Sequence, residues 1–117
     1  MKEVYITLTG FYSYYGFKPF AIGRRIRCVK EPQNPYDTEA IRAEMKHIGT
    51  VAYVANSINT VAMGTSSAGA VGHLVNNTFT VEIMFMTSTK IICKVVDGLK
   101  NKNHKPPKCY VDDVINF

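Results

Sequence analysis

Short segments that alternate apolar and polar residues recur along the chain, separated by turns that contain Gly, Pro or Asn. Alternation with a period of two is typical of a β-strand that buries one face and exposes the other. The pattern predicts strands over residues 4–12, 21–30, 39–45, 47–55, 78–86 and 91–96. In the third of these, Ile41, Ala43 and Met45 share one face, and Arg42 and Glu44 share the other.

The second predicted strand collects basic residues on one side. Ile22, Ile26 and Cys28 form the apolar set of residues 21–30, so Arg25 and Arg27 fall together on the opposite face. A strand with this composition presents a basic surface.

These strands predict a mainly β fold with a single domain over residues 1–117. We expect a small antiparallel barrel, OB-like or SH3-like, with five to seven strands and one or two short helices. A β-sandwich is the alternative. A short helix is expected over residues 56–64, a loop with at most a short strand or helical turn over 65–77, and a mobile segment over 98–108.

Composition narrows the classes of function. No apolar run approaches the roughly 18–20 residues that span a bilayer, and the first residues lack the features of a signal peptide, so we expect a cytoplasmic protein without a membrane partner. The residues suggest no metal site, no cofactor and no catalytic set, which indicates a protein that is not an enzyme. Three cysteines without a C-x-x-C pair predict free thiols, buried at Cys28 and Cys93. The net charge of +5 fits a polyanionic partner.

The stretch "EPQNPYD", residues 31–37, predicts a rigid connection between strands, because its two prolines cannot lie in a central strand. Asn34 and Asp37 are types that cap turns through local backbone groups. Asp37 also suits recognition of a strand end, since an ionised carboxylate accepts the proton of a 3′-hydroxyl and repels a 3′-phosphate. Tyr36 offers a face on which a base can stack, worth about 1–3 kcal/mol. The residues alone leave both interpretations open.

The order of these segments resembles the HIRAN domain, a small β-barrel module found alone in bacteria and fused to helicases of DNA repair. The resemblance is strongest over residues 4–55, through "VKEPQNPYDTEAIRAE" and "IGTVAYVA". The residues that fit the family's pattern at the turn are Val29, Lys30, Pro32, Asn34, Asp37, Ala40 and Ile41. The chain departs from the helicase-like form at Tyr12, which stands where that form has a basic residue, at Ser13, which replaces an aromatic residue, and at Ala52, which replaces a glycine.

The resemblance implies binding of single-stranded DNA at a free 3′-hydroxyl end, in the processing of stalled forks, with Tyr36 stacking on the last base and Asp37 bonding the hydroxyl. A helicase or nuclease would act in trans as a partner. The candidate DNA-binding residues are Tyr12, Tyr14, Arg24, Arg25, Arg27, Asn34, Tyr36, Asp37, Arg42 and Tyr53.

We expect these residues to line one cleft between residues 12–16, 22–29 and 34–37. Two other functions remain open. The chain could be an adaptor that binds a peptide of a larger helicase or nuclease, through the same cleft or an open strand edge. A nuclease subunit is the third hypothesis.

Overall fold

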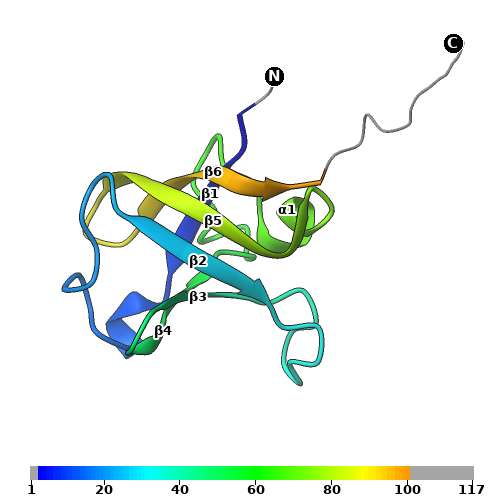
Figure 1. Ribbon diagram of the computed structural model, residues 1–117, viewed down its shortest axis with the longest axis horizontal. Helices are drawn as coiled ribbons and strands as arrows, with labels where there is room; N and C mark the ends of the chain where they lie inside the picture. Colours follow the sequence, from blue (N-terminus) through cyan, green and yellow to red (C-terminus); the bar gives the residue numbers. More distant parts are fainter. Residues whose placement is uncertain (1–2, 101–117) are drawn as a thin grey trace, which may run out of the picture.

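The computed structural model describes residues 3–100 of the 117 residues. Six antiparallel strands close into a barrel in the order β1-β4-β3-β2-β5-β6 (Figure 1). The strands are β1 (Tyr5–Thr9), β2 (Arg25–Lys30), β3 (Ile41–Met45), β4 (Gly49–Val54), β5 (Val75–Met86) and β6 (Ile91–Leu99). A 3-10 helix, η1 (Phe11–Ser13), and a short α-helix, α1 (Ala68–Gly72), complete the fold. The predicted mainly β barrel is confirmed, and the sandwich alternative is not.

In most strands every second side chain is buried, and in β1 and β4 adjacent residues are buried as well. Ile26 and Cys28 of β2 and Ile41 and Ala43 of β3 are at most 1% exposed, which confirms the predicted inward faces of these strands. Full burial of an isoleucine side chain contributes roughly 1.5–3 kcal/mol to the stability of the fold. Burial also raises the pKa of Cys93 to about 12, so this thiol stays protonated at neutral pH.

Aromatic residues between β1 and β2 close the barrel near η1. The ring of Phe11 lies 5.0 Å from that of Phe17 and 6.0 Å from that of Phe20, measured between centroids. Helix α1 packs against β5 on a separate side of the barrel (Figure 1). None of the helices among residues 3–100 is long and apolar enough to cross a membrane.

The prediction of a helix over residues 56–64 is wrong. This segment forms turns, in which the carbonyl of Ser57 accepts from the backbone N–H of Thr60 and Val61. Ile58 and Met63 are almost fully exposed, so the segment has no apolar face that a helix would bury. The α-helix instead follows Ser67 within the predicted loop 65–77.

Several strand boundaries differ from the prediction. β1 ends at Thr9, three residues earlier than expected, and β5 begins at Val75, three residues earlier than expected. β2 begins at Arg25, and Ile22, expected on its apolar face, is 69% exposed in the preceding turn. β6 extends to Leu99, so residues 98 and 99 of the expected mobile segment lie in a strand. Gly98 there has a φ of +94°, and a Cβ would lie 2.5 Å from the Cβ of Phe79. Residues 101–117, with Cys109, lie outside the described residues.

Candidate nucleic-acid interface

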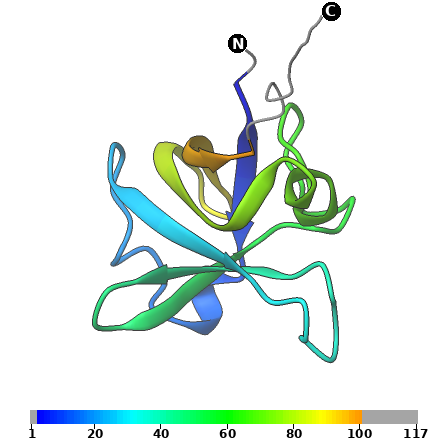
Figure 2. The ribbon, with the colours of Figure 1, turned by 45° about the vertical axis from the view of Figure 1, so that its right-hand side comes forward.

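The loop between β2 and β3, residues 31–40, is folded around the side chain of Asn34. Its Oδ1 accepts hydrogen bonds from the backbone N–H groups of Tyr36 at 2.8 Å and Asp37 at 3.1 Å. A side-chain amide that bonds the backbone two and three residues later holds a turn in one conformation. The loop projects from the barrel, at the end of β2 (Figure 2). Asn34 therefore fixes the positions of the two residues on which end recognition was predicted to depend.

Tyr36 and Asp37 are presented differently by this loop. Tyr36 is 96% exposed, so the face of its ring is open to a ligand. Asp37 is half-buried; its Oδ1 accepts from Glu39 N at 2.9 Å and its Oδ2 from Asn56 Nδ2 at 3.1 Å. Each carboxylate oxygen can accept about two hydrogen bonds, so Asp37 caps the turn and keeps acceptor capacity for a ligand. The two interpretations of Asp37 are thus compatible.

Glu31 ties the loop to the barrel. Its carboxylate accepts from Asn34 Nδ2 at 2.9 Å, from the Tyr53 hydroxyl at 3.0 Å and from Arg42 Nη1 at 3.3 Å. Only 16% of the Glu31 side chain is exposed. Hydrogen bonds to an ionised acceptor are stronger than neutral ones. The carboxylate therefore anchors Asn34, and through Asn34 the turn that holds Tyr36 and Asp37.

The ionisation of Glu31 and Tyr53 follows from this network. Burial alone would raise the pKa of Glu31, but hydrogen bonds from Asn34, Tyr53 and Arg42 outweigh it and lower that pKa below its usual value. Burial, together with the hydrogen bond to Glu31, raises the pKa of Tyr53 to about 12. At neutral pH the network therefore contains an ionised Glu31 and a neutral Tyr53.

Tyr14, which directly follows η1, joins this network through its ring contact with Tyr53. Its ring centroid lies 6.4 Å from that of Tyr53, with an angle of 36° between the planes. Tyr14 is 43% exposed, and Tyr53 is half-buried. Aromatic rings at this separation support each other and leave outer faces for stacking. Tyr14, Tyr53 and the loop thus form one connected site.

Glu31 was not among the residues predicted for the site. The hairpin register contained the signal: Val29 pairs with Arg42, and Glu31 lies two residues beyond Val29 on the same face. A carboxylate at that position is a diagonal neighbour of the arginine. The contacts with Tyr53 depend on the pairing of β3 with β4, which the residues 31–42 alone do not specify.

Tyr12 lies elsewhere. Its hydroxyl donates to the carbonyl of Ser88 at 2.9 Å, in the connection between β5 and β6. Its ring lies 4.8 Å from that of Phe11 and 5.4 Å from that of Phe17. Tyr12 therefore closes the aromatic end of the barrel and is separate from the pair of Tyr14 and Tyr53.

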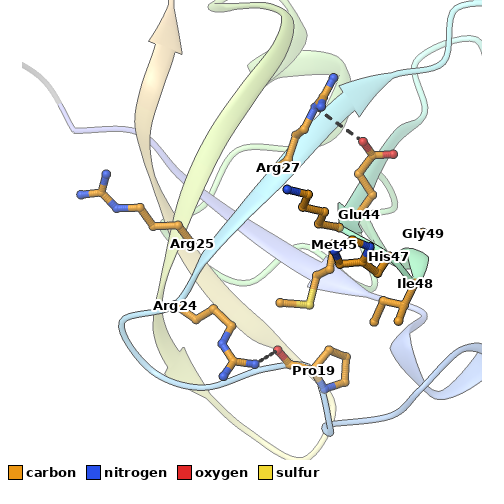
Figure 3. Close-up of a pocket in the computed structure, with 10 residues that line it drawn as sticks. Pro19, Arg24, Arg25, Arg27, Glu44, Met45, His47, Ile48 and Gly49 are labelled. Carbon is orange, nitrogen blue, oxygen red and sulfur yellow. Dashed lines mark hydrogen bonds and ion pairs between the residues drawn. The ribbon is translucent and has the colours of Figure 1, made fainter.

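The predicted arginines divide into two groups. Arg42 belongs to the loop site, where it pairs with Glu31 and, at 3.0 Å, with Glu44. Arg24, Arg25 and Arg27 lie toward the opposite end of β2 and line a groove with the turn between β3 and β4 (Figure 3). The residues expected in a single cleft therefore lie in two regions, toward opposite ends of β2. A strand rises about 3.3 Å per residue, so the two regions are separated along its length.

Lys30, a neighbouring basic residue of the turn, has a structural contact. Its Nζ donates to the carbonyls of Gly72 at 2.8 Å and Val75 at 2.9 Å, so it holds the end of α1 to the barrel. Among residues 3–100, no three His, Cys, Asp or Glu side chains are grouped as a metal site would require.

Comparison with known proteins places this geometry in a family. The model of the HIRAN domain family matches residues 1–90. The crystal structure of the HIRAN domain of human HLTF is similar with a TM-score of 0.59 and 17% sequence identity, covering 88% of this chain and 80% of that chain. No curated protein matches the chain. At this identity the similarity to the solved structure shows the fold.

Proposed function

Because the chain belongs to the HIRAN domain family, whose members are nucleic-acid-binding modules, we propose that it binds single-stranded DNA at a free 3′-hydroxyl end. The HIRAN domain is a binding fold and not a catalytic one. In this role the chain addresses the end of a strand, in the processing of stalled forks, and a helicase or nuclease on another chain performs the chemistry.

The observation that carries the proposal is the pairing of an exposed ring with a carboxylate on one rigid turn. Asn34 Oδ1 holds the backbone of both Tyr36 and Asp37, so the stacking residue and the acceptor residue are presented from one fixed turn. The terminal base stacks on Tyr36, and the terminal hydroxyl donates to Asp37. A 3′-phosphate brings negative charge to the same oxygens and is repelled.

Tyr14 and Tyr53 supply a second stacking surface in this proposal. They connect to the turn through Glu31 and Asn34, and Tyr14 is exposed on its outer side. Stacking tolerates any base, so binding should depend on the end of the strand and little on its sequence.

The test is a titration of two labelled oligonucleotides that differ only in a 3′-hydroxyl or a 3′-phosphate, followed by fluorescence anisotropy. The wild-type protein should prefer the hydroxyl by about tenfold or more, a difference of about 1.4 kcal/mol. Asp37→Asn should bring the two affinities together, whereas Asp97→Asn, which removes an exposed carboxylate on β6, should leave the ratio unchanged. Equal binding of both ends by the wild type would refute end recognition.

Tyr36→Ala tests the stacking separately. It should weaken binding of the hydroxyl end by about 5- to 150-fold, which corresponds to about 1–3 kcal/mol. Because Tyr36 is 96% exposed, the substitution should leave the urea unfolding curve unchanged. Unchanged affinity would show that the ring does not contact DNA.

A peptide-binding adaptor is the second candidate, and one observation favours it. Ile58 and Met63 are 93% and 102% exposed in the turns after β4, close along the chain to Asn56, which contacts Asp37. Closure of the barrel among residues 3–100 pairs every strand on both sides, so an open strand edge is not available there. Failure to retain either oligonucleotide would favour this candidate, and shortening of the oligonucleotide would favour a nuclease.

A further inference from the structure

The turn between β3 and β4 and the start of β2 enclose a groove of about 1000 Å³, which we call the β2 groove. Its walls come from Pro19, from the arginines at positions 24, 25 and 27, and from residues 44–49. Figure 3 shows Arg27 reaching toward Glu44 on the neighbouring strand β3, and Arg24 bonded to the carbonyl of Pro19. The groove lies at the opposite end of β2 from the loop that carries Tyr36 (Figure 2).

Charge is distributed unevenly between these two regions. Four cationic residues, Arg24, Arg25, Arg27 and Lys46, and one carboxylate, Glu44, line the β2 groove. The side chain of Arg25 points away from the other three, toward Glu82 of β5 (Figure 3). Residues 31–42, in contrast, carry three carboxylates and one arginine. A polyanion therefore meets attraction at the groove and repulsion at the loop.

We propose that the β2 groove is a second nucleic-acid contact, which binds the phosphodiester backbone of single-stranded DNA without regard to its end. The inference takes its ligand class, nucleic acid, from the proposed function, but it does not depend on recognition of a 3′-hydroxyl.

The ion pairs of the groove arginines are readily exchanged for phosphates. Arg25 Nε lies 3.7 Å from Glu82, Arg27 Nε lies 3.5 Å from Glu44, and the two arginine side chains are 66% and 62% exposed. Exposed pairs of this kind contribute about 0–1 kcal/mol. Among the described residues, the Nη atoms of these arginines make no hydrogen bond, and the ion-pair distance of each is measured from Nε. Those atoms match the oxygens of a phosphate.

Glu44 keeps a partner when Arg27 turns toward a phosphate. Its Oε1 lies 3.0 Å from Arg42 Nε, closer than its other oxygen lies to Arg27. The carboxylate, which is 23% exposed, is therefore never left without a compensating charge. Removing a sole partner from a buried carboxylate would oppose phosphate binding, and this arrangement avoids that cost.

The spacing of the arginines suits an extended strand. Arg25 and Arg27 lie on the same outer face, two residues apart, which corresponds to about 6.6 Å. Arg25 turns toward β5 and Arg27 toward β3, so they hold neighbouring phosphates when each guanidinium leaves its carboxylate. Residues 25–31 cover about 20 Å along β2, so one strand of a few nucleotides can lie in the groove and reach the loop with its 3′ end.

The experiment uses oligonucleotides that carry a 3′-phosphate, so that binding at the end does not contribute. Anisotropy titrations over a series of salt concentrations compare strands of about 4 and about 16 nucleotides, the range that single barrels of this kind cover. The double variant Arg25→Gln/Arg27→Gln should bind the longer strand about 25-fold more weakly at 0.1 M salt, with a salt slope smaller by about 1.4, because each phosphate contact contributes about 0.7.

The control removes two positive charges elsewhere. Lys94→Gln/Lys100→Gln, on and just after β6, has the same net charge as the groove variant and should retain wild-type affinity within about twofold. Lys46→Gln, in the exposed turn, provides an independent groove variant with a slope reduced by about 0.7. Equal urea midpoints confirm that all variants are folded.

Three results would overturn the inference: an unchanged salt slope in the groove variants, an equal loss in the β6 control, or displacement of DNA by polyglutamate as effectively as by DNA. The last would identify the groove as a site for acidic protein. The ratio of affinities for hydroxyl and phosphate ends should stay unchanged in the groove variants. Loss of that ratio in the wild type would refute end recognition and leave the groove proposal standing.

Discussion

Replacing Glu31 by Gln tests whether one carboxylate holds the candidate site together. The side chain is 16% exposed and accepts hydrogen bonds from Asn34, Tyr53 and Arg42. Gln keeps one acceptor oxygen for Asn34 and Tyr53 but turns its amide group toward Arg42, which has donors only. One charge-assisted bond is lost and two become neutral, so we expect a loss of about 2–3 kcal/mol of unfolding free energy at pH 7.

Urea unfolding followed by circular dichroism measures this change, with Glu82→Gln as the matched control. Among the described residues, Glu82 forms one ion pair, with Arg25 at 3.7 Å, and its side chain is 31% exposed, so its loss should cost under about 1 kcal/mol. The reasoning is wrong if the two variants lose the same free energy.

The pH dependence of stability gives a second measure. The pKa of Glu31 is lower in the folded chain than its usual value of 4.5. Its contribution is therefore present above pH 4.5 and is lost as the pH falls through the folded pKa. The difference between wild type and Glu31→Gln should shrink in acid. A difference that stays constant down to the acid transition would show that the charge of Glu31 contributes nothing.

Three further outcomes follow from the structure. In an ultraviolet titration, one tyrosine should ionise near pH 12, and Tyr53→Phe should remove that step. The same substitution should remove the loss of stability that accompanies the ionisation as the pH rises from about 10 to 12. Ionisation of every tyrosine near pH 10 would contradict this. Gly98→Ala should cost more than about 2 kcal/mol of unfolding free energy, because the new methyl overlaps the core, against about 1 kcal/mol for Gly23→Ala, which also has a positive φ but open space around it; equal losses would show that the overlap is relieved. The preference for a hydroxyl end over a phosphate end, measured by anisotropy, should decline as salt is raised, and a constant ratio would exclude discrimination by charge.

The strands could be predicted from the sequence, whereas the structure of the connection over residues 56–64 could not. Period-two alternation depends only on neighbours in the chain, so it located β3 and its two faces, including buried Ile41 and Ala43. The prediction of a helix over residues 56–64 was wrong because the residue types that cap helices also favour turns. Nothing in its own residues showed that Ile58 would find no surface to pack against.

Within the candidate site, contacts between residues close in the sequence could be predicted, and contacts between distant residues could not. The bonds from Asn34 to the turn are local, within three residues, and the prolines and the Asn-Pro-Tyr-Asp order indicated them. The bond from Tyr53 to Glu31 joins residues 22 apart in the sequence, and the contact of Tyr14 with Tyr53 depends on the position of η1 beside β4. Such contacts follow from the pairing and register of the strands, which alternation alone does not determine.

The acidic loop at one end of β2 and the basic groove at the other have complementary roles in the two proposals. An acidic loop is a poor place to bind an internal segment of DNA, because each phosphate near Asp37 raises the energy by about 1 kcal/mol at 4 Å in water and more at a protein surface. A terminal nucleotide with a free hydroxyl avoids one such phosphate, and the loop therefore selects by repulsion. Repulsion alone gives no affinity, so a site of this kind needs attraction from a surface far enough away to leave the selection intact. Arg25 and Arg27 of the β2 groove lie about 13–20 Å along the chain from residue 31, so the groove meets that requirement.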